Sequence, residues 1–122
     1  MNREILFRSK RVDNDEWVYG FLVKMWGQYH IIDQNDENSA YMIKPKTVGQ
    51  FTGLCDKNGK KIFDGDIVES PNGTQGFIEW QNAECAFLVN IGDDWQTMDD
   101  CPYEVVGNIY DKGEEEGNKS ER

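Results

Sequence analysis

Short apolar runs separated by tight turns constrain the fold of this chain more than any other feature of its sequence. No long segment repeats apolar residues at the i, i+3, i+4 spacing of an amphipathic helix. In the second half, turns such as Pro71-Asn72-Gly73 separate runs that are rich in β-branched and aromatic residues. These runs are residues 66–69, 74–80, 85–91 and 103–110. Strands at a spacing of about ten residues predict a meander that curls into a small barrel.

The first half predicts an opening hairpin followed by further short strands. In residues 4–11 the alternation places Ile5 and Phe7 on one face, and residues 16–26 are dense in β-branched and aromatic side chains. Asp13-Asn14-Asp15 between them predicts a turn. Gly20 indicates a bulge or a crowded contact within its strand. Residues 29–32 predict a third strand, and the polar residues 33–39 predict a surface loop.

We therefore predict a mainly β protein in three parts. Residues 1–50 form an N-terminal β-hairpin region, residues 51–111 a small β-barrel, and residues 112–122 an acidic tail. The tail has no apolar residue and should be disordered. Whether the two β parts share one core is left open. The large rings, Trp17, Trp26, Trp80 and Trp95 among them, should supply the bulk that a small core needs.

The formal net charge of −10 is carried by the second half. Residues 1–61 hold ten Lys and Arg against eight Asp and Glu, whereas residues 62–122 hold three against fifteen. Nucleic-acid binding depends on cation contacts to phosphates, so this acidic half disfavours it without excluding it. The first half has only a modest basic cluster, which consists of Arg3, Arg8, Lys10 and Arg11. An acidic surface suits a basic partner or serves solubility.

Cysteine usage and the absence of apolar segments predict a cytoplasmic protein. The three cysteines, with no C-x-x-C spacing, indicate free thiols rather than disulfides or a zinc site. The N-terminus is charged from Arg3 onward and lacks the apolar stretch of a secretory signal. No apolar run approaches the roughly 20 residues that span a bilayer.

No set of side chains assembles the roles that an enzyme needs. His30 is the only histidine, so we expect a partly exposed surface residue rather than a catalytic or metal-binding one. Cys85 lies in an apolar run, where a thiol is normally buried and inert. Phosphate-binding glycine motifs are missing from the sequence. We predict no catalytic residue, no cofactor and no metal.

One acidic loop holds the candidate partner-binding residues. Its carboxylates could bind a hard cation through oxygen ligands, as could the pair Asp64 and Asp66, but a solvated loop is favoured. A large ring among acids is costly when merely exposed, so Trp95 either packs back onto the barrel or contacts a partner. Both interpretations stay open. The candidate set is Trp95, Asp93, Asp94, Asp99 and Asp100.

Several separated motifs occur in a fixed order along the chain. Gln50-Phe51-Thr52-Gly53-Leu54 is followed by Asp56-Lys57-Asn58-Gly59-Lys60 and by Ile62-Phe63-Asp64-Gly65-Asp66-Ile67-Val68. Val106-Gly107-Asn108-Ile109-Tyr110 closes the series, and Arg3-Glu4-Ile5 leads to Phe7-Arg8 at the N-terminus. In order and spacing these motifs resemble the YopX family of bacteriophage and prophage proteins. The resemblance covers nearly the whole chain except residues 33–39 and the tail.

The resemblance implies a small, phage-encoded, cytoplasmic protein whose C-terminal part is similar to a Src-homology-3-like barrel. It brings neither a catalytic residue nor a known biochemical role. The shared residues have an architectural explanation, because glycines adopt backbone geometries that a side chain forbids and aspartates bond backbone N–H groups in turns. Ile67 and Val68 should supply buried strand faces. The residues assigned to turns and architecture are Gly53, Asp56, Asn58, Gly59, Asp64, Gly65, Asp66 and Gly107.

These observations predict a non-catalytic phage accessory protein that binds another protein, or itself, through β-edges and exposed aromatic residues. Two alternatives stay open. In the first, the acidic second half is a decoy that occupies a nucleic-acid-binding protein of the host. In the second, the small barrel binds nucleic acid through the basic N-terminal cluster and stacking aromatics.

Overall fold

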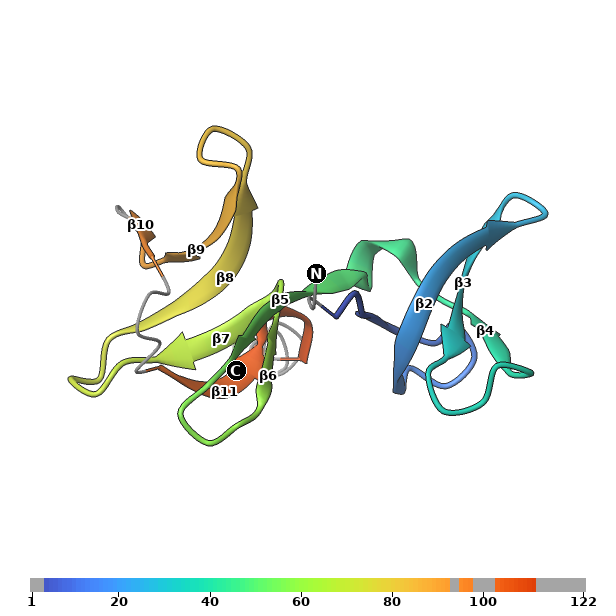
Figure 1. The fold of residues 1–122 in the computed structure, drawn as a ribbon, viewed down its shortest axis with the longest axis horizontal. Coiled ribbons are helices and arrows are strands. Elements are labelled where there is room, and N and C mark those ends of the chain that lie inside the picture. The colour runs from blue at the N-terminus through green and yellow to red at the C-terminus, as the bar shows by residue number, and fades with distance from the viewer. Residues whose placement is uncertain (1–3, 93–94, 98–102, 112–122) are drawn as a thin grey trace, which may run out of the picture. The chain divides into compact units, whose positions relative to one another are not determined.

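The structure is a computed structural model that describes residues 4–92, 95–97 and 103–111 (Figure 1). The chain divides into two compact units, Met1–Gly53 and Leu54–Arg122, whereas the sequence predicted a division after residue 50. The first unit contains β1 (Phe7–Lys10), β2 (Trp17–Met25), β3 (Gln28–Asp33), β4 (Ala40–Met42), the short 3-10 helix η1 (Pro45–Thr47) and most of β5 (Gly49–Cys55). The second contains β6 (Lys61–Phe63), β7 (Asp66–Glu69), β8 (Gln75–Gln81), β9 (Ala86–Asn90), β10 (Trp95–Gln96) and β11 (Glu104–Asn108). A helical turn follows at residues 109–111. The prediction of a mainly β protein is confirmed, and the predicted tail lies outside the described residues.

The strands of the first unit pair in the order β4-β3-β2-β1-β5, and β6 follows β5 in the same six-stranded order. The predicted opening hairpin is confirmed, because β1 and β2 pair from Phe7 with Gly20 to Lys10 with Trp17. Gly20 also makes the predicted crowded contact: a Cβ there would lie 1.8 Å from the carbonyl oxygen of Ile32 on β3. The β2–β3 hairpin therefore depends on a residue with no side chain at that position.

Burial in and before β1 does not follow the predicted alternation, because side chains of both faces of the strand are buried. Ile5 is 62% exposed, whereas Leu6 is 2% and Ser9 0% exposed. The Ser9 hydroxyl lies 2.6 Å from the Thr47 hydroxyl on η1 and donates to the Lys44 carbonyl. Thr47 Oγ1 also accepts a bond from the Lys10 N–H at 2.9 Å. Polar groups are buried when hydrogen bonds satisfy them, so these bonds explain how Ser9 and Thr47 can be buried.

The sheet of the second unit is open, so the predicted small barrel is not closed within the described residues. Its strands follow the order β10-β9-β8-β7-β11. β10 pairs with β9 through two residues only, Trp95 with Asn90 and Gln96 with Val89. β11 pairs with β7 across an irregularity between Val105 and Gly107. Within the described residues these two strands end the sheet, because no ladder joins them.

Aliphatic residues and one tyrosine, rather than the tryptophans, form the core of the second unit. The buried cluster consists of Ile62, Val68, Ile78, Val89 and Tyr103. β-branched side chains fit the pleated faces of short strands, which is why they fill this space. The prediction that tryptophans supply the core is wrong: none is buried, and Trp80 and Trp95 are 44% and 38% exposed.

The prediction for Cys85 is also wrong. This thiol is exposed, and the residue has a φ of +52° in the turn that joins β8 to β9. The apolar run of β9 begins only at Ala86, so Cys85 belongs to the turn and not to the strand. Its Sγ lies 3.5 Å from the Asn82 carbonyl oxygen.

Adding one methyl group at Gly20 should destabilise the protein severely. In Gly20→Ala the new Cβ would overlap the Ile32 carbonyl, so β2 and β3 must separate. We expect a loss of about 3 kcal/mol or more in the free energy of unfolding, measured by urea denaturation. Gly107→Ala is the matched control, since a Cβ there meets no atom within 4 Å, and it should change stability by less than about 0.5 kcal/mol. Similar losses for both variants would contradict the packing argument.

Candidate functional site

The buried carboxylate of Asp56 organises the turn between β5 and β6. Asp56 is 6% exposed. Its Oδ1 accepts bonds from the N–H groups of Asn58 at 2.8 Å and Lys60 at 2.9 Å. Gly59 completes the turn with a φ of +85°, which a glycine adopts without strain. Burial alone would raise the pKa of the Asp56 carboxyl, but its backbone N–H bonds outweigh burial and hold the pKa below the usual value.

The same carboxylate also holds β11. Asp56 Oδ2 accepts a bond from the Val105 N–H at 2.9 Å, across 49 positions of sequence. Beside it, the Lys57 N–H donates to the Tyr103 carbonyl at 3.1 Å, and Lys57 Nζ lies 3.6 Å from Glu104. The turn of the second motif is therefore fixed against the strand that contains the last motif.

The third motif meets the last one around Gly65. The Gly65 N–H donates to the Ile78 carbonyl, and the Gly65 carbonyl accepts from Ile109 at 2.8 Å. Gly65 has a φ of +94°, and a Cβ there would lie 3.1 Å from the Tyr110 ring. The Asp66 carboxylate, 2% exposed, accepts from the Phe63 N–H at 2.8 Å. Backbone conformation and space thus both require glycine at position 65.

Asn108 begins the helical turn that follows β11. Its Oδ1 accepts bonds from the N–H groups of Tyr110 at 3.0 Å and Asp111 at 2.8 Å. This is the N-capping contact that asparagine makes well. Gly53 has the positive φ that its motif predicted, whereas Gly107 does not, and a Cβ on Gly107 would be unobstructed. The prediction that Gly107 needs a special backbone geometry is therefore wrong.

Motifs that are far apart in the sequence thus converge on one network within the second unit. A family model described as YopX protein matches residues 6–114. The chain belongs to the YopX family. No curated protein matches the chain. In this YopX protein, Asp56, Asn58, Gly59, Gly65 and Asp66 all take part in turns, and Asp64 is half-buried in the turn between β6 and β7.

Of the candidate partner-binding residues, the structure describes only Trp95. Asp93, Asp94, Asp99 and Asp100 lie outside the described residues. Trp95 is on β10 and lines a pocket of about 440 Å³ in the second unit. Leu88 and Ala83 add apolar surface to the pocket, and Glu84 is its charged residue. Cavities of about 300–1,000 Å³ hold drug-sized ligands, so this pocket has room for one large side chain.

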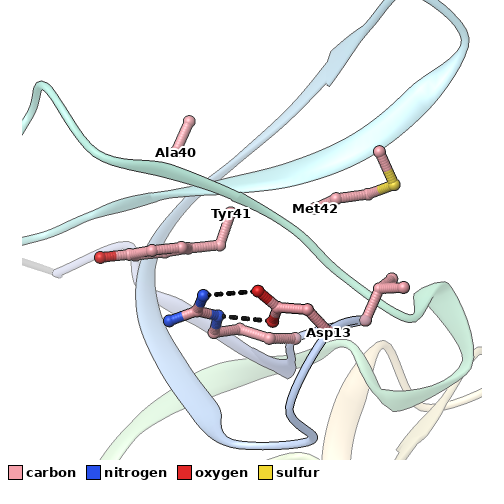
Figure 2. A pocket seen from close by; sticks show the side chains of 6 residues that line it. Asp13, Ala40, Tyr41 and Met42 are labelled. Carbon is pink, nitrogen blue, oxygen red and sulfur yellow. Dashed lines mark hydrogen bonds and ion pairs between the residues drawn. The ribbon is translucent and has the colours of Figure 1, made fainter.

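A second pocket, of about 400 Å³, lies in the first unit between β4 and the turn after β1 (Figure 2). Arg11 bonds both carboxylate oxygens of Asp13, at 3.0 and 2.7 Å. Its guanidinium also lies 4.2 Å from the ring centroid of Tyr41. The bond to Asp13 raises the pKa of Arg11, and the bond to Arg11 lowers the pKa of Asp13. The two charges therefore compensate each other, which leaves this pocket poorly suited to a phosphate.

The described side chains of the basic N-terminal cluster are either buried or paired with a carboxylate. Arg8 and Lys10 are 6% and 5% exposed. The Arg8 guanidinium lies 4.7 Å, and Lys10 Nζ 5.5 Å, from the ring centroid of Trp17. Arg11 bonds Asp13, and Arg3 lies outside the described residues. Buried cations that stack on a half-buried ring are poorly placed to contact phosphates, so this geometry does not favour the nucleic-acid alternative.

Among the described residues, the large apolar side chain with the highest exposed fraction was not predicted from the sequence. Trp26 is 89% exposed at the tip of the β2–β3 hairpin, and it has a φ of +50°. Gly27 beside it has a φ of +78°, so both turn residues have positive φ. Positive φ at both positions is the signature of a type I′ turn, in which asparagine followed by glycine is the preferred pair. A Trp-Gly pair between two runs that are rich in β-branched and aromatic residues was the sequence signal that could have predicted this turn.

The described residues contain neither a cluster of metal ligands nor a helix that could span a membrane. Among residues 4–92, 95–97 and 103–111, no three His, Cys, Asp or Glu side chains gather as ligands of a metal would. In the same ranges no helix is both long and apolar enough to cross a membrane. His30 is half-buried on β3, with Nδ1 3.2 Å from the Gln28 carbonyl oxygen.

Replacing Asp56 should reveal how far the second unit depends on one carboxylate. Asp56→Asn keeps one carbonyl oxygen but puts an NH₂ group opposite a backbone N–H, so we expect a loss of about 2 kcal/mol at neutral pH. Because the folded pKa is depressed, this stabilisation is present above the unfolded pKa of about 3.9 and is lost as the pH falls through the folded value. Urea denaturation at pH 7 and pH 3 should therefore show the wild type and the variant converging at low pH.

Glu104→Gln is the control for the Asp56 experiment. It removes only the half-exposed ion pair with Lys57 and should change stability by less than about 0.5 kcal/mol. A loss in Asp56→Asn that stays constant between pH 7 and pH 3 would contradict a role for the ionised carboxylate.

Proposed function

We propose that this YopX protein is a non-catalytic accessory protein that binds a protein partner through the tip of its β2–β3 hairpin. The observation that carries the proposal is Trp26, which is 89% exposed in a turn with a positive φ. Tryptophan is among the residues most enriched at binding hot spots. Its indole in this position offers a partner about 150–250 Å² of surface to bury.

Two costs in the folded chain support a function for Trp26. A bulky residue in the left-handed region costs about 1–2 kcal/mol, whereas Asn before Gly would satisfy the same turn with little strain. Because the indole is exposed to water, it does not contribute the free energy that burying its apolar surface would give. Strained positions of this kind cluster at functional sites. Burial of Trp26 against a partner would offset both costs.

The hairpin that carries Trp26 offers a larger apolar surface than the tip alone. Tyr19 and Phe21 on β2 are 37% and 50% exposed, and Tyr29 on β3 is 37% exposed. Lys24 Nζ lies 5.3 Å from the Tyr29 ring centroid, which places a positive charge near the tip. Residues 17–32 include no Asp or Glu. A partner surface with an apolar pocket and a negative charge would therefore complement this hairpin.

The cellular setting is part of the same proposal. The resemblance stated from the sequence motifs supports a phage or prophage protein that acts in the cytoplasm of a bacterial host. The second unit would serve as an open variant of a Src-homology-3-like barrel, and the antiparallel order of β7, β8 and β9 supports this. The network around Asp56 would keep that unit rigid.

An acidic decoy is the second candidate function, because all the net charge lies in the second unit. Residues 54–122 hold sixteen Asp and Glu against six Lys and Arg, whereas residues 1–53 hold seven of each. A concentrated negative surface attracts basic nucleic-acid-binding proteins. Binding by charge is screened by salt, so the decoy predicts a partner that is recovered only at low ionic strength.

Trp26→Asn should separate stability from binding. Asparagine tolerates the left-handed conformation, so we expect the free energy of unfolding to rise by about 1 kcal/mol in urea denaturation. In a tagged pull-down from a bacterial lysate at low and high salt, the variant should lose a partner that the wild type recovers in stoichiometric amounts. Ile5→Ala, which removes an apolar side chain that is 62% exposed in the first unit but outside the hairpin, is the control and should retain that partner. Equal recovery by the wild type and Trp26→Asn would refute the proposed role of the tip.

A further inference from the structure

We infer that the partner of the Trp26 tip is a second copy of this chain, in which the indole enters the pocket lined by Trp95 and Leu88. This inference rests on the proposed binding role of the tip and names its occupant. It would make the protein a self-assembling accessory protein with a defined tip-to-pocket contact.

The pocket has the size and chemistry that an indole requires. Its volume is about 440 Å³, and Leu88, Ala83 and Trp95 supply apolar and aromatic surface. Gln81 and Gln96 line it as well, so carbonyl oxygens are available to accept the indole N–H. A ring inserted beside Trp95 would add an aromatic contact of the kind that stabilises interfaces by more than its buried area alone.

Charge complementarity favours a second copy as the occupant. The tip carries Lys24 and no carboxylate lies within residues 17–32, whereas Glu84 lines the pocket. The pocket belongs to the unit whose residues, 54–122, have a net charge of −10, and the tip belongs to the neutral stretch 1–53. Opposite potentials steer such surfaces together and fix their register. Contacts between two tips or between two pockets would place like charges together.

The contact joins two different surfaces, so two chains can exchange tips in a two-fold dimer, or the contact can continue head to tail. Each chain has one Trp26 tip in its first unit and one Trp95 pocket in its second. A head-to-tail contact of this kind repeats from chain to chain and produces either a closed ring or an open filament. The wild type should therefore form dimers or larger species as its concentration rises.

Two variants that each remove one side of the contact provide the test. Trp26→Asn removes the indole and keeps the turn, and Ala83→Arg places a long cation in the pocket from an exposed turn position. In analytical ultracentrifugation, each variant alone should associate at least about 30-fold more weakly than the wild type. An equimolar mixture of the two should form a dimer and nothing larger, because one intact tip meets one intact pocket. Circular dichroism checks that both variants are folded.

Other outcomes of these experiments would contradict the inference, and one of them would also contradict the proposed function. Assembly by Ala83→Arg alone would overturn the inference, because it would show that the tip binds elsewhere. A weakening by Ile5→Ala equal to that of Trp26→Asn would also overturn it, because Ile5 lies outside the hairpin. A monomeric wild type at every concentration would overturn it too, yet the proposed function would stand if the pull-down still recovered a partner that Trp26→Asn loses. If Trp26→Asn changes neither assembly nor recovery, both proposals fail.

Discussion

The second unit depends on one buried carboxylate that bonds backbone groups from both ends of its sequence. Asp56 is the acceptor for its own turn and for Val105 on β11, so a single ion joins the first and last strands of the unit. A buried charge is tolerated only when hydrogen bonds replace its lost hydration. Here backbone N–H groups supply these hydrogen bonds. The Asp56 carboxylate can therefore be buried only when the strands are in place, and the strands in turn need the carboxylate to accept bonds from their N–H groups.

The first unit is held together in a different way. Its buried polar contact, between Ser9 and Thr47, joins β1 to η1, and Arg8 stacks on Trp17. The remaining surface of the β2–β3 hairpin is only partly covered, and Gly20 and Ile31 are its buried residues. A unit built in this way keeps exposed aromatic residues on the hairpin, apart from its buried contacts. This separation lets the hairpin be specialised for contact with another molecule.

Local chemistry explains which features could be predicted from the sequence. The turns at Asp13–Asp15 and at Asn58-Gly59, the opening hairpin and the crowded Gly20 all follow from residues close together in the chain. The burial of Ser9 on β1, the bond from Val105 to Asp56 and the open edge at β10 depend on partners that sequence patterns do not identify. Trp26 was missed for a related reason, because composition treats a tryptophan as core material and only the hairpin register places it in a turn.

The uneven distribution of apolar packing has a consequence for how the protein opens. The buried cluster of the structure lies in the second unit, on β6 to β9 and at Tyr103, whereas buried apolar residues of the first unit, such as Leu6 and Ile31, are not part of it. Elements with few buried contacts unfold locally at a lower free energy than core strands. Amide hydrogens near the tip of β2 and β3 should therefore exchange with solvent deuterium well before those of β7 and β8. The hairpin could then adjust its conformation to another molecule while the Asp56 network stays closed.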